Sequence, residues 1–231
     1  MKSELVGGGF VELQEVMGSE LTIVNAARVS FGKQKTVLDE GDLRLLDYLI
    51  RNRHYSPLRH VFMRFHIRAP EFVMRQWFKH VVGSEWSSEA AQPLHGWNEI
   101  SGRYLEWKES YHPIQWRRQS SSAKQGSDGV LGTDESDQCH QKYRQALHQV
   151  EETYHELLNL GVAKEQARMI LPLSTFTECI WTASLQAVLH FILLRTDSHA
   201  QEEIQEYAHI LRVMVQEQFP HVLSYYLSHI S

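Results

Sequence analysis

The fold is decided by residues 61–67, which read VFMRFHI. Positions 61, 63, 65 and 67 are apolar, whereas Arg64 and His66 stand between them. Because successive side chains of a strand point to opposite faces of a sheet, this alternation predicts a strand that is buried on one face only.

Outward from this strand, two further stretches have strand character. Residues 10–16 alternate apolar and polar side chains, and residues 175–182 are rich in β-branched and aromatic ones. Elsewhere, apolar residues recur at helical spacing. The helices expected from them are 21–29, 39–51, 70–80, 143–160, 163–170, 184–195 and a last long one that contains 204–215.

Caps and loops complete this prediction. Ser184 and Asp197 are suitable N-caps for the last two helices, and Gly161 is a suitable C-cap. Residues 117–138 are rich in Ser, Gly, Gln and Asp and have almost no core residues, which predicts a long, mobile surface loop. We therefore expect residues 1–231 to form a single α+β domain with a small, mainly antiparallel sheet and several helices.

Composition excludes several classes of protein. The 231 residues carry a net charge of −5, whereas proteins that coat nucleic acid normally have a basic excess. The two cysteines, Cys139 and Cys179, are far apart, which argues against a disulfide scaffold and a cysteine-rich zinc site. With no signal peptide and no apolar stretch long enough to cross a bilayer, we expect a soluble, cytoplasmic protein that contacts no membrane.

The first polar cluster is RQWFKH at residues 75–80. On a helix Arg75 and Lys79 share one face, and Gln76 and His80 share the adjacent one. Two cations at this spacing repel each other unless an anion lies against them, so the face is a candidate anion site. An ordinary solvated helix face fits the same pattern equally well.

The second cluster, NEISGRY at residues 98–104, has the parts of a phosphate site. Ser101 offers a hydroxyl, Gly102 leaves backbone N–H groups accessible, and Arg103 offers a guanidinium fork. Glu99 precedes them. The alternative is a polar helix start, where the helix dipole favours a carboxylate such as that of Glu99.

Single arginines and histidines complete the candidates. Arg168 precedes a Leu-Pro-Leu stretch, and Arg195 ends a predicted helix shortly before His199. Taken singly, an arginine at a helix C-terminus compensates the dipole, and a lone histidine is usually structural. The 14 histidines show no HExxH spacing, so we expect no metal site.

Seven stretches, in this order along nearly the whole chain, resemble the flavin-dependent thymidylate synthase family. They are NAARVSF at 25–31, HYSPLRH at 54–60, RQWFKH at 75–80, NEISGRY at 98–104, KQGS at 124–127, ARMILPL at 167–173 and LRTDSHAQ at 194–201. The family signature begins Arg-His-Arg, whereas this chain has Lys79-His80-Val81. The spacer of 17 residues, 81–97, is longer than the compact form, and Ser184 and His190 stand where asparagine is expected.

The resemblance implies an intertwined homotetramer with active sites between subunits, in which FAD stacks on a pyrimidine nucleotide. The residues that would bind FAD are Ser30, Ser56, Lys79, His80, Val81, Glu99, Ser184, Gln186, His190 and His199. Those that would bind the nucleotide are Gln76, Lys79, Glu99, Ser101, Gly102, Arg103, Arg168 and Arg195.

The same resemblance implies a reaction, the conversion of dUMP to dTMP. Methylenetetrahydrofolate would supply the carbon, NADPH would reduce the flavin, and no enzyme cysteine would attack the base. Arg195 would be catalytic, because it would lie against the pyrimidine and stabilise negative charge as N3 ionises.

Three alternatives stay open at this point. A family member that methylates the ribonucleotide UMP would differ by as little as one contact at the 2′ position. A non-catalytic nucleotide-binding protein would keep the fold and lose the reaction. A metal hydrolase that uses the histidines is disfavoured by their spacing.

Overall fold

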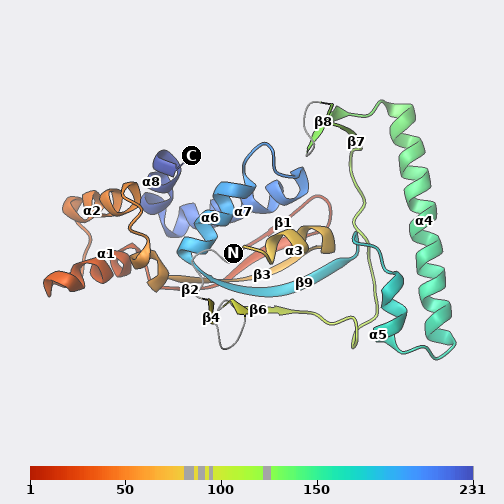
Figure 1. Cartoon of the computed structure of the whole chain (residues 1–231), viewed down its shortest axis with the longest axis horizontal. Coiled ribbons are helices and arrows are strands. Elements are labelled where there is room, and N and C mark those ends of the chain that lie inside the picture. The colour runs from red at the N-terminus through yellow and green to blue at the C-terminus, as the bar shows by residue number, and fades with distance from the viewer. Residues whose placement is uncertain (81–85, 88–91, 94–95, 122–125, 231) are drawn as a thin grey trace.

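The computed structural model describes residues 1–80, 86–87, 92–93, 96–121 and 126–230. Its centre is an antiparallel sheet in the order β1-β2-β3-β9-β6 (Figure 1). The strands are β1 Lys2–Glu4, β2 Phe10–Met17, β3 Phe62–Pro70, β9 Phe176–Ser184 and β6 Gly96–Glu99. The α+β class with a small antiparallel sheet is thus confirmed for the part of the chain that the structure describes.

Strand β3 is the middle of the sheet, and the alternation of its sequence is realised. It pairs with β9 along its full length, with Phe65 opposite Trp181. Met63, Phe65 and Ile67 are fully buried, whereas Arg64 is exposed on the other face. The rings of Phe65 and Trp181 stack at 5.6 Å, which ties the two strands together on the core face.

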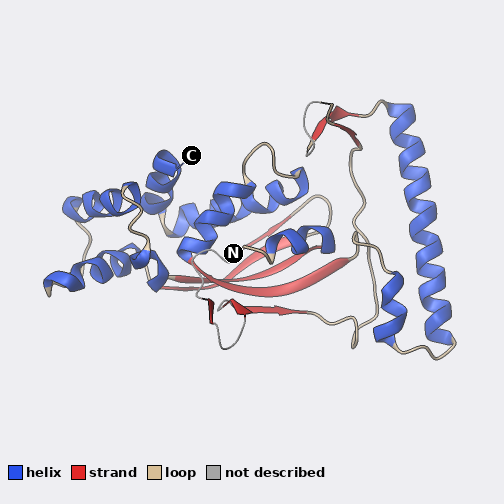
Figure 2. Ribbon diagram, viewed as in Figure 1, coloured by secondary structure: helices blue, strands red, loops and turns tan. Residues whose placement is uncertain are grey.

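Helices cover the core face of the sheet, as Figure 2 shows. They are α3 Glu71–Trp77, α6 Leu185–Arg195 and α7 Glu202–Gln218. Trp77 of α3 stacks on Phe191 of α6 at 4.3 Å. Most of α6 is buried, in keeping with its nearly unbroken run of apolar residues. The ends of α3 and α6 are therefore fixed by the core.

The remaining elements lie at the two ends of the molecule (Figure 1). One end holds α1 Glu20–Arg28, α2 Glu40–Arg51 and α8 Pro220–Ile230, with the 3-10 turns η1 Val29–Phe31 and η2 Ser56–His60. The other holds α4 Thr133–Asn159, α5 Lys164–Ala167 and η3 Arg168–Ile170. Two short pairs complete the structure: β4 Trp86–Ser87 with β5 Gln92–Pro93, and β7 Arg117–Gln119 with β8 Ser127–Val130.

Residues 117–138 differ from the predicted loop. They contain the β7–β8 pair, and α4 begins at Thr133, ten residues before the predicted start at 143. The first turns of α4 are exposed or half-buried, so they have no apolar face for periodicity to detect. The helix start is instead stabilised by Glu135, whose carboxylate accepts the N–H of Gly132 at 3.2 Å.

Two predicted helix boundaries were wrong. The helix expected over 70–80 ends at Trp77, so His80 lies beyond it. The helix expected to be capped by Asp197 begins at Glu202, with Gln201 as its N-cap residue. Ser184 does cap α6, its Oγ accepting the N–H of Ala187 at 3.3 Å. The sequence reading also missed β1, β6 and α8.

Candidate functional site

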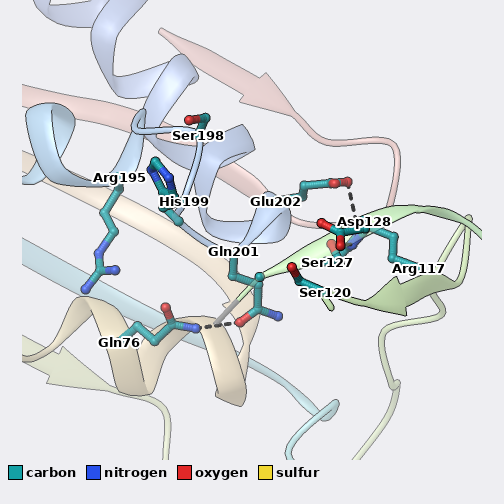
Figure 3. A pocket seen from close by; sticks show the side chains of 12 residues that line it. Gln76, Arg117, Ser120, Ser127, Asp128, Arg195, Ser198, His199, Gln201 and Glu202 are labelled. Carbon is teal, nitrogen blue, oxygen red and sulfur yellow. Dashed lines mark hydrogen bonds and ion pairs between the residues drawn. The ribbon is translucent and has the colours of Figure 1, made fainter. Parts of the chain in front are cut away.

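A cavity of about 600 Å³ lies where α3, α6 and the start of α7 meet the β7–β8 pair (Figure 3). Gln76, Arg195 and His199, all predicted site residues, line it. Gln76 comes from α3, Arg195 is the last residue of α6, and His199 stands in the connection to α7. The structure thus brings together residues that are more than a hundred positions apart in the sequence.

The connection between α6 and α7 is a hydrogen-bonded turn that forms one wall of the cavity. The carboxylate of Asp197 accepts the backbone N–H of His199 at 2.8 Å, and Ala200 N–H donates to the carbonyl of Asp197 at 3.0 Å. Across the cavity, the Gln76 amide donates to Gln201 Oε1 at 2.7 Å, as drawn in Figure 3. Asp197 therefore shapes the turn and does not cap α7.

Arg195 is held from behind by a histidine. Its Nε donates to Nε2 of His80 at 2.8 Å. His80 is 7% exposed, and its own N–H donates to the carbonyl of Trp77. Burial, with smaller contributions from the charges of Arg195 and His190, lowers the pKa of His80 to about 4. His80 is therefore a neutral acceptor at physiological pH, and Arg195 carries the charge.

The β7–β8 pair closes the opposite edge of the cavity. Arg117 Nη2 binds both carboxylate oxygens of Glu203, at 2.8 and 2.9 Å, and Nη1 reaches Glu202 at 3.1 Å. These ion pairs attach the hairpin to the first turn of α7. Ser127 and Asp128 of β8 also line the cavity.

Sequence reasoning missed these residues of the hairpin. A usable signal was present at Gly126 and Gly129, which adopt positive φ of 97° and 60°. Paired glycines of this kind mark turns within a polar stretch. The lining residues Gln201 and Ser198 were within reach too, because both belong to the LRTDSHAQ stretch.

A second cluster lies near the start of α3 and contains Ser101, Gly102, Arg103 and Arg168. Ser101 Oγ accepts from the backbone N–H and from Nε of Arg103, at 3.3 and 3.2 Å. A Cβ at Gly102 would lie only 3.2 Å from Cδ of Arg168, so the glycine lets that arginine pack closely. These four residues thus lie together, and they offer an anion two guanidinium groups and a hydroxyl.

Glu99 lies beside this second cluster, on β6. Its Oε1 accepts the hydroxyl of the buried Thr177 at 2.7 Å. Its charge also acts on Glu71, the first residue of α3. Burial is the larger cause that raises the pKa of Glu71, and the charge of Glu99 is the smaller one. The charges of Arg75 and Arg168 oppose this rise. The second cluster thus contains two carboxylates as well as its arginines.

The other predicted flavin residues are distributed over the chain. Ser30 and Ser56 are exposed on η1 and η2, near α1 and α2. Ser184 caps α6, and Gln186 accepts from Arg59 Nε at 2.8 Å. These residues do not line the cavity described above. Val81 lies outside the residues that the structure describes.

The residues next to the cavity fit a flavin. Lys79 is exposed beside His80, and a cation is what the diphosphate of FAD requires. The ring of His190 lies 6.3 Å from that of His80, and its Nδ1 is buried without a partner among the described residues. A buried, unpaired ring nitrogen is a hydrogen-bonding group that a ligand can use. In the part of the chain that the structure describes, no group of three or more His, Cys, Asp or Glu side chains is placed to hold a metal ion.

Comparison with known proteins gives consistent matches. Residues 12–221 match the family model described as thymidylate synthase complementing protein. A flavin-dependent thymidylate synthase of Thermus thermophilus is 42% identical over 92% of this chain and 73% of its own length. That of Kosmotoga olearia is 38% identical over 90% of this chain and 85% of its own.

A solved structure matches as well. The UMP/dUMP methylase PolB from Streptomyces cacaoi, bound with 5-Br dUMP, is 31% identical. It covers 98% of this chain and 97% of its own, with a TM-score of 0.82.

An enzyme of the methyltransferase class is defined by the fold, by the arginines of the cavity and of the second cluster, and by the matches to known proteins. More particularly, the chain belongs to the family of flavin-dependent thymidylate synthases, and its cofactor is FAD. In the described part of the chain, no helix has the length and apolar character needed to span a bilayer.

Proposed function

We propose that this protein methylates C5 of dUMP to give dTMP, with methylenetetrahydrofolate as carbon donor and NADPH as reductant. The observation that carries the proposal is the pair of arginine clusters: Arg195 with Gln76 in the cavity, and Arg103 with Arg168 beside Ser101. The similar structure bound with 5-Br dUMP supports a pyrimidine nucleotide as the ligand.

Each cluster suits one part of the nucleotide. The guanidinium groups of Arg103 and Arg168, with the hydroxyl of Ser101, suit the phosphate. Gly102 lets Arg168 approach closely, and Glu99 suits the ribose hydroxyl. Arg195, with Gln76 beside it, suits the pyrimidine, where its charge stabilises the base as N3 ionises.

The flavin supplies the redox and carbon-transfer chemistry when it is bound, and the protein positions it. Lys79 and His190 would hold it beside the cavity, with Ser30, Ser56, Ser184, Gln186 and His199 as further contacts. A cysteine nucleophile is disfavoured, because burial raises the pKa of the Cys179 thiol well above its ordinary value.

We further propose a homotetramer whose active sites are shared between subunits. The arginine clusters lie at opposite ends of α3, and Ser30 and Ser56 lie at the end of the molecule that holds α1 and α2 (Figure 1). One chain therefore distributes the predicted contacts over several surfaces, as a shared site requires. The free cysteines Cys139 and Cys179 suit a reducing compartment, so we place the enzyme in the cytoplasm.

A second candidate substrate is UMP. It is favoured by one observation: the protein of the similar solved structure is a UMP/dUMP methylase. Discrimination between the two nucleotides depends on contacts at the 2′ hydroxyl. The non-catalytic alternative is disfavoured, because Ser101, Arg103, Arg168 and Arg195 are all present.

Turnover of purified protein on dUMP and UMP, with FAD, methylenetetrahydrofolate and NADPH, tests the proposal. We expect Arg195→Ala to retain FAD, measured by its visible absorption, and to lose turnover by at least about a hundredfold. Arg212→Ala, at an exposed arginine of α7, is the matched control and should leave both unchanged. Normal turnover by Arg195→Ala with full flavin content would remove Arg195 from the mechanism.

A further inference from the structure

The contact between Arg195 and His80 fixes the state of the histidine. An arginine Nε is always a donor, so Nε2 of His80, 2.8 Å away, must be the acceptor. A neutral imidazole has one proton, and it must therefore be on Nδ1. A protonated His80 would have no lone pair to offer, and the contact to Arg195 would be lost.

The ring of His80 cannot easily move away from this position. It lies edge-on to Phe191 at 4.9 Å, and Phe191 itself is stacked on Trp77. The backbone N–H of His80 is bound to the carbonyl of Trp77 at 2.9 Å. His80 is thus attached by ring and backbone to the aromatic core between α3 and α6, and it offers Arg195 a rigid acceptor.

The guanidinium has its remaining donors available on the other side. Among the described residues, Arg195 donates a hydrogen bond from Nε only, which leaves Nη1 and Nη2 for a ligand. Arg195 lines the cavity, whereas His80, at 7% exposed, lies behind it. The arrangement resembles a substrate-contacting group backed by a second group that sets its orientation.

We propose that His80 is a positioning residue for Arg195: by accepting the Nε proton it directs the two terminal nitrogens of the guanidinium to the pyrimidine. This inference rests on the proposed function, in which Arg195 faces the base. It assigns His80 a role in place of the flavin contact that the family resemblance implies. It also gives a reason for a histidine at position 80 in a chain whose neighbouring residues are Lys79 and Val81.

Two substitutions separate this role from a flavin contact. His80→Phe keeps a ring against Phe191 and removes the acceptor, whereas His80→Gln keeps an amide oxygen that can accept from Nε. We expect His80→Phe to bind FAD fully and to lower kcat on dUMP by about a hundredfold, the effect of a misplaced catalytic group. We expect His80→Gln to recover turnover to within about tenfold of the wild type. His209→Gln, at an exposed histidine of α7, is the matched control.

A second measurement does not depend on turnover. In protein labelled with ¹⁵N-histidine, the ring of His80 should show the Nδ1–H tautomer. The signals of His80 are identified as those that are missing from the spectrum of His80→Gln. Arg195→Met keeps an unbranched side chain, removes the Nε donor and should abolish the preference for this tautomer. These spectra test the contact even if His80→Phe does not fold.

The outcomes are distinct. Loss of FAD in both His80 variants would make His80 a flavin contact and overturn the inference. Normal kcat in His80→Phe, or an Nε2–H tautomer in the wild type, would overturn it as well. A wild-type protein with bound FAD that methylates neither dUMP nor UMP would overturn the proposed function itself, before any variant is compared.

Discussion

His80 shows how far a single residue can depart from its sequence context. Helical spacing places it with Gln76, on the face next to that of Arg75 and Lys79, but α3 ends at Trp77 and the chain turns His80 inward. The two neighbours thus have opposite environments, one buried and one exposed. A helix boundary moved by three residues decides this, and boundaries are what periodicity defines least well.

The depressed pKa of His80 predicts a pH dependence of stability. Burial first, then the charges of Arg195 and His190 on α6, lower the pKa from 6.5 to about 4. Between these values the unfolded chain binds a proton at this residue that the folded chain does not. The free energy of unfolding should therefore have its full value above pH 6.5, and it should fall by up to about 3 kcal/mol as the pH decreases to 4.

Urea unfolding of the flavin-free protein between pH 4.5 and 7.5 measures this slope. Burial also lowers the pKa of His190, which adds a slope of the same sign. His80→Gln should reduce the slope, and the exposed His209→Gln should leave it unchanged. An equal slope in wild type and His80→Gln would show that another group titrates in this range.

Among the elements, those with a strong apolar pattern were predicted and those without one were not. The alternating residues 61–67 correspond to β3, and the helically spaced residues 39–51 correspond to α2. Both were predictable because each element buries one face. The start of α4 and the hairpin β7–β8 are surface structures formed by polar residues. Their stability comes from contacts such as Arg117 with Glu203, which join distant parts of the chain and leave no local pattern.

Helix α8 offers a test of such a distant contact. Glu20, at 6% exposed, accepts the N–H groups of His221 and Val222, both at 2.9 Å, and its other oxygen lies 2.8 Å from His221 Nδ1. A residue of α1 therefore caps a helix 200 positions later. Glu20→Ala should destabilise the protein by about 1–3 kcal/mol, because two N–H groups lose their acceptor.

Thermal unfolding and hydrogen exchange of the α8 amides would measure the effect of Glu20→Ala. Glu40→Ala is the matched control, since its carboxylate is 93% exposed and pairs with Arg44 across 3.7 Å at the surface. That pair is worth less than about 1 kcal/mol. Equal unfolding midpoints and equal α8 exchange in the two variants would contradict the capping role.

For the whole molecule, the sequence gives candidate site residues but not which of them meet. Gln76, Arg195 and His199 share one cavity, whereas Gly102 and Arg168 pack together near the other end of α3. No motif spacing predicts this division, because it follows from the way β6, β9 and α3 cross in space. Exposed Ser30 and Ser56 lie elsewhere again. Their common role in one site stays a prediction that depends on the assembly.

Mixing of inactive variants tests whether subunits share active sites. Arg195→Ala should disable the cavity and Arg103→Ala should disable the second cluster, so each variant alone should be inactive. If each site takes one cluster from each of two subunits, co-expression in equal amounts restores about a quarter of the sites, those with both clusters intact.

Arg195→Ala mixed with Gln76→Ala, which disables the same cluster twice, should restore none. Turnover of the first mixture no higher than that of the second would show that both clusters serve one site within a single chain. The distance between the ends of α3, about 10 Å for seven residues, would then have to be bridged by the nucleotide itself.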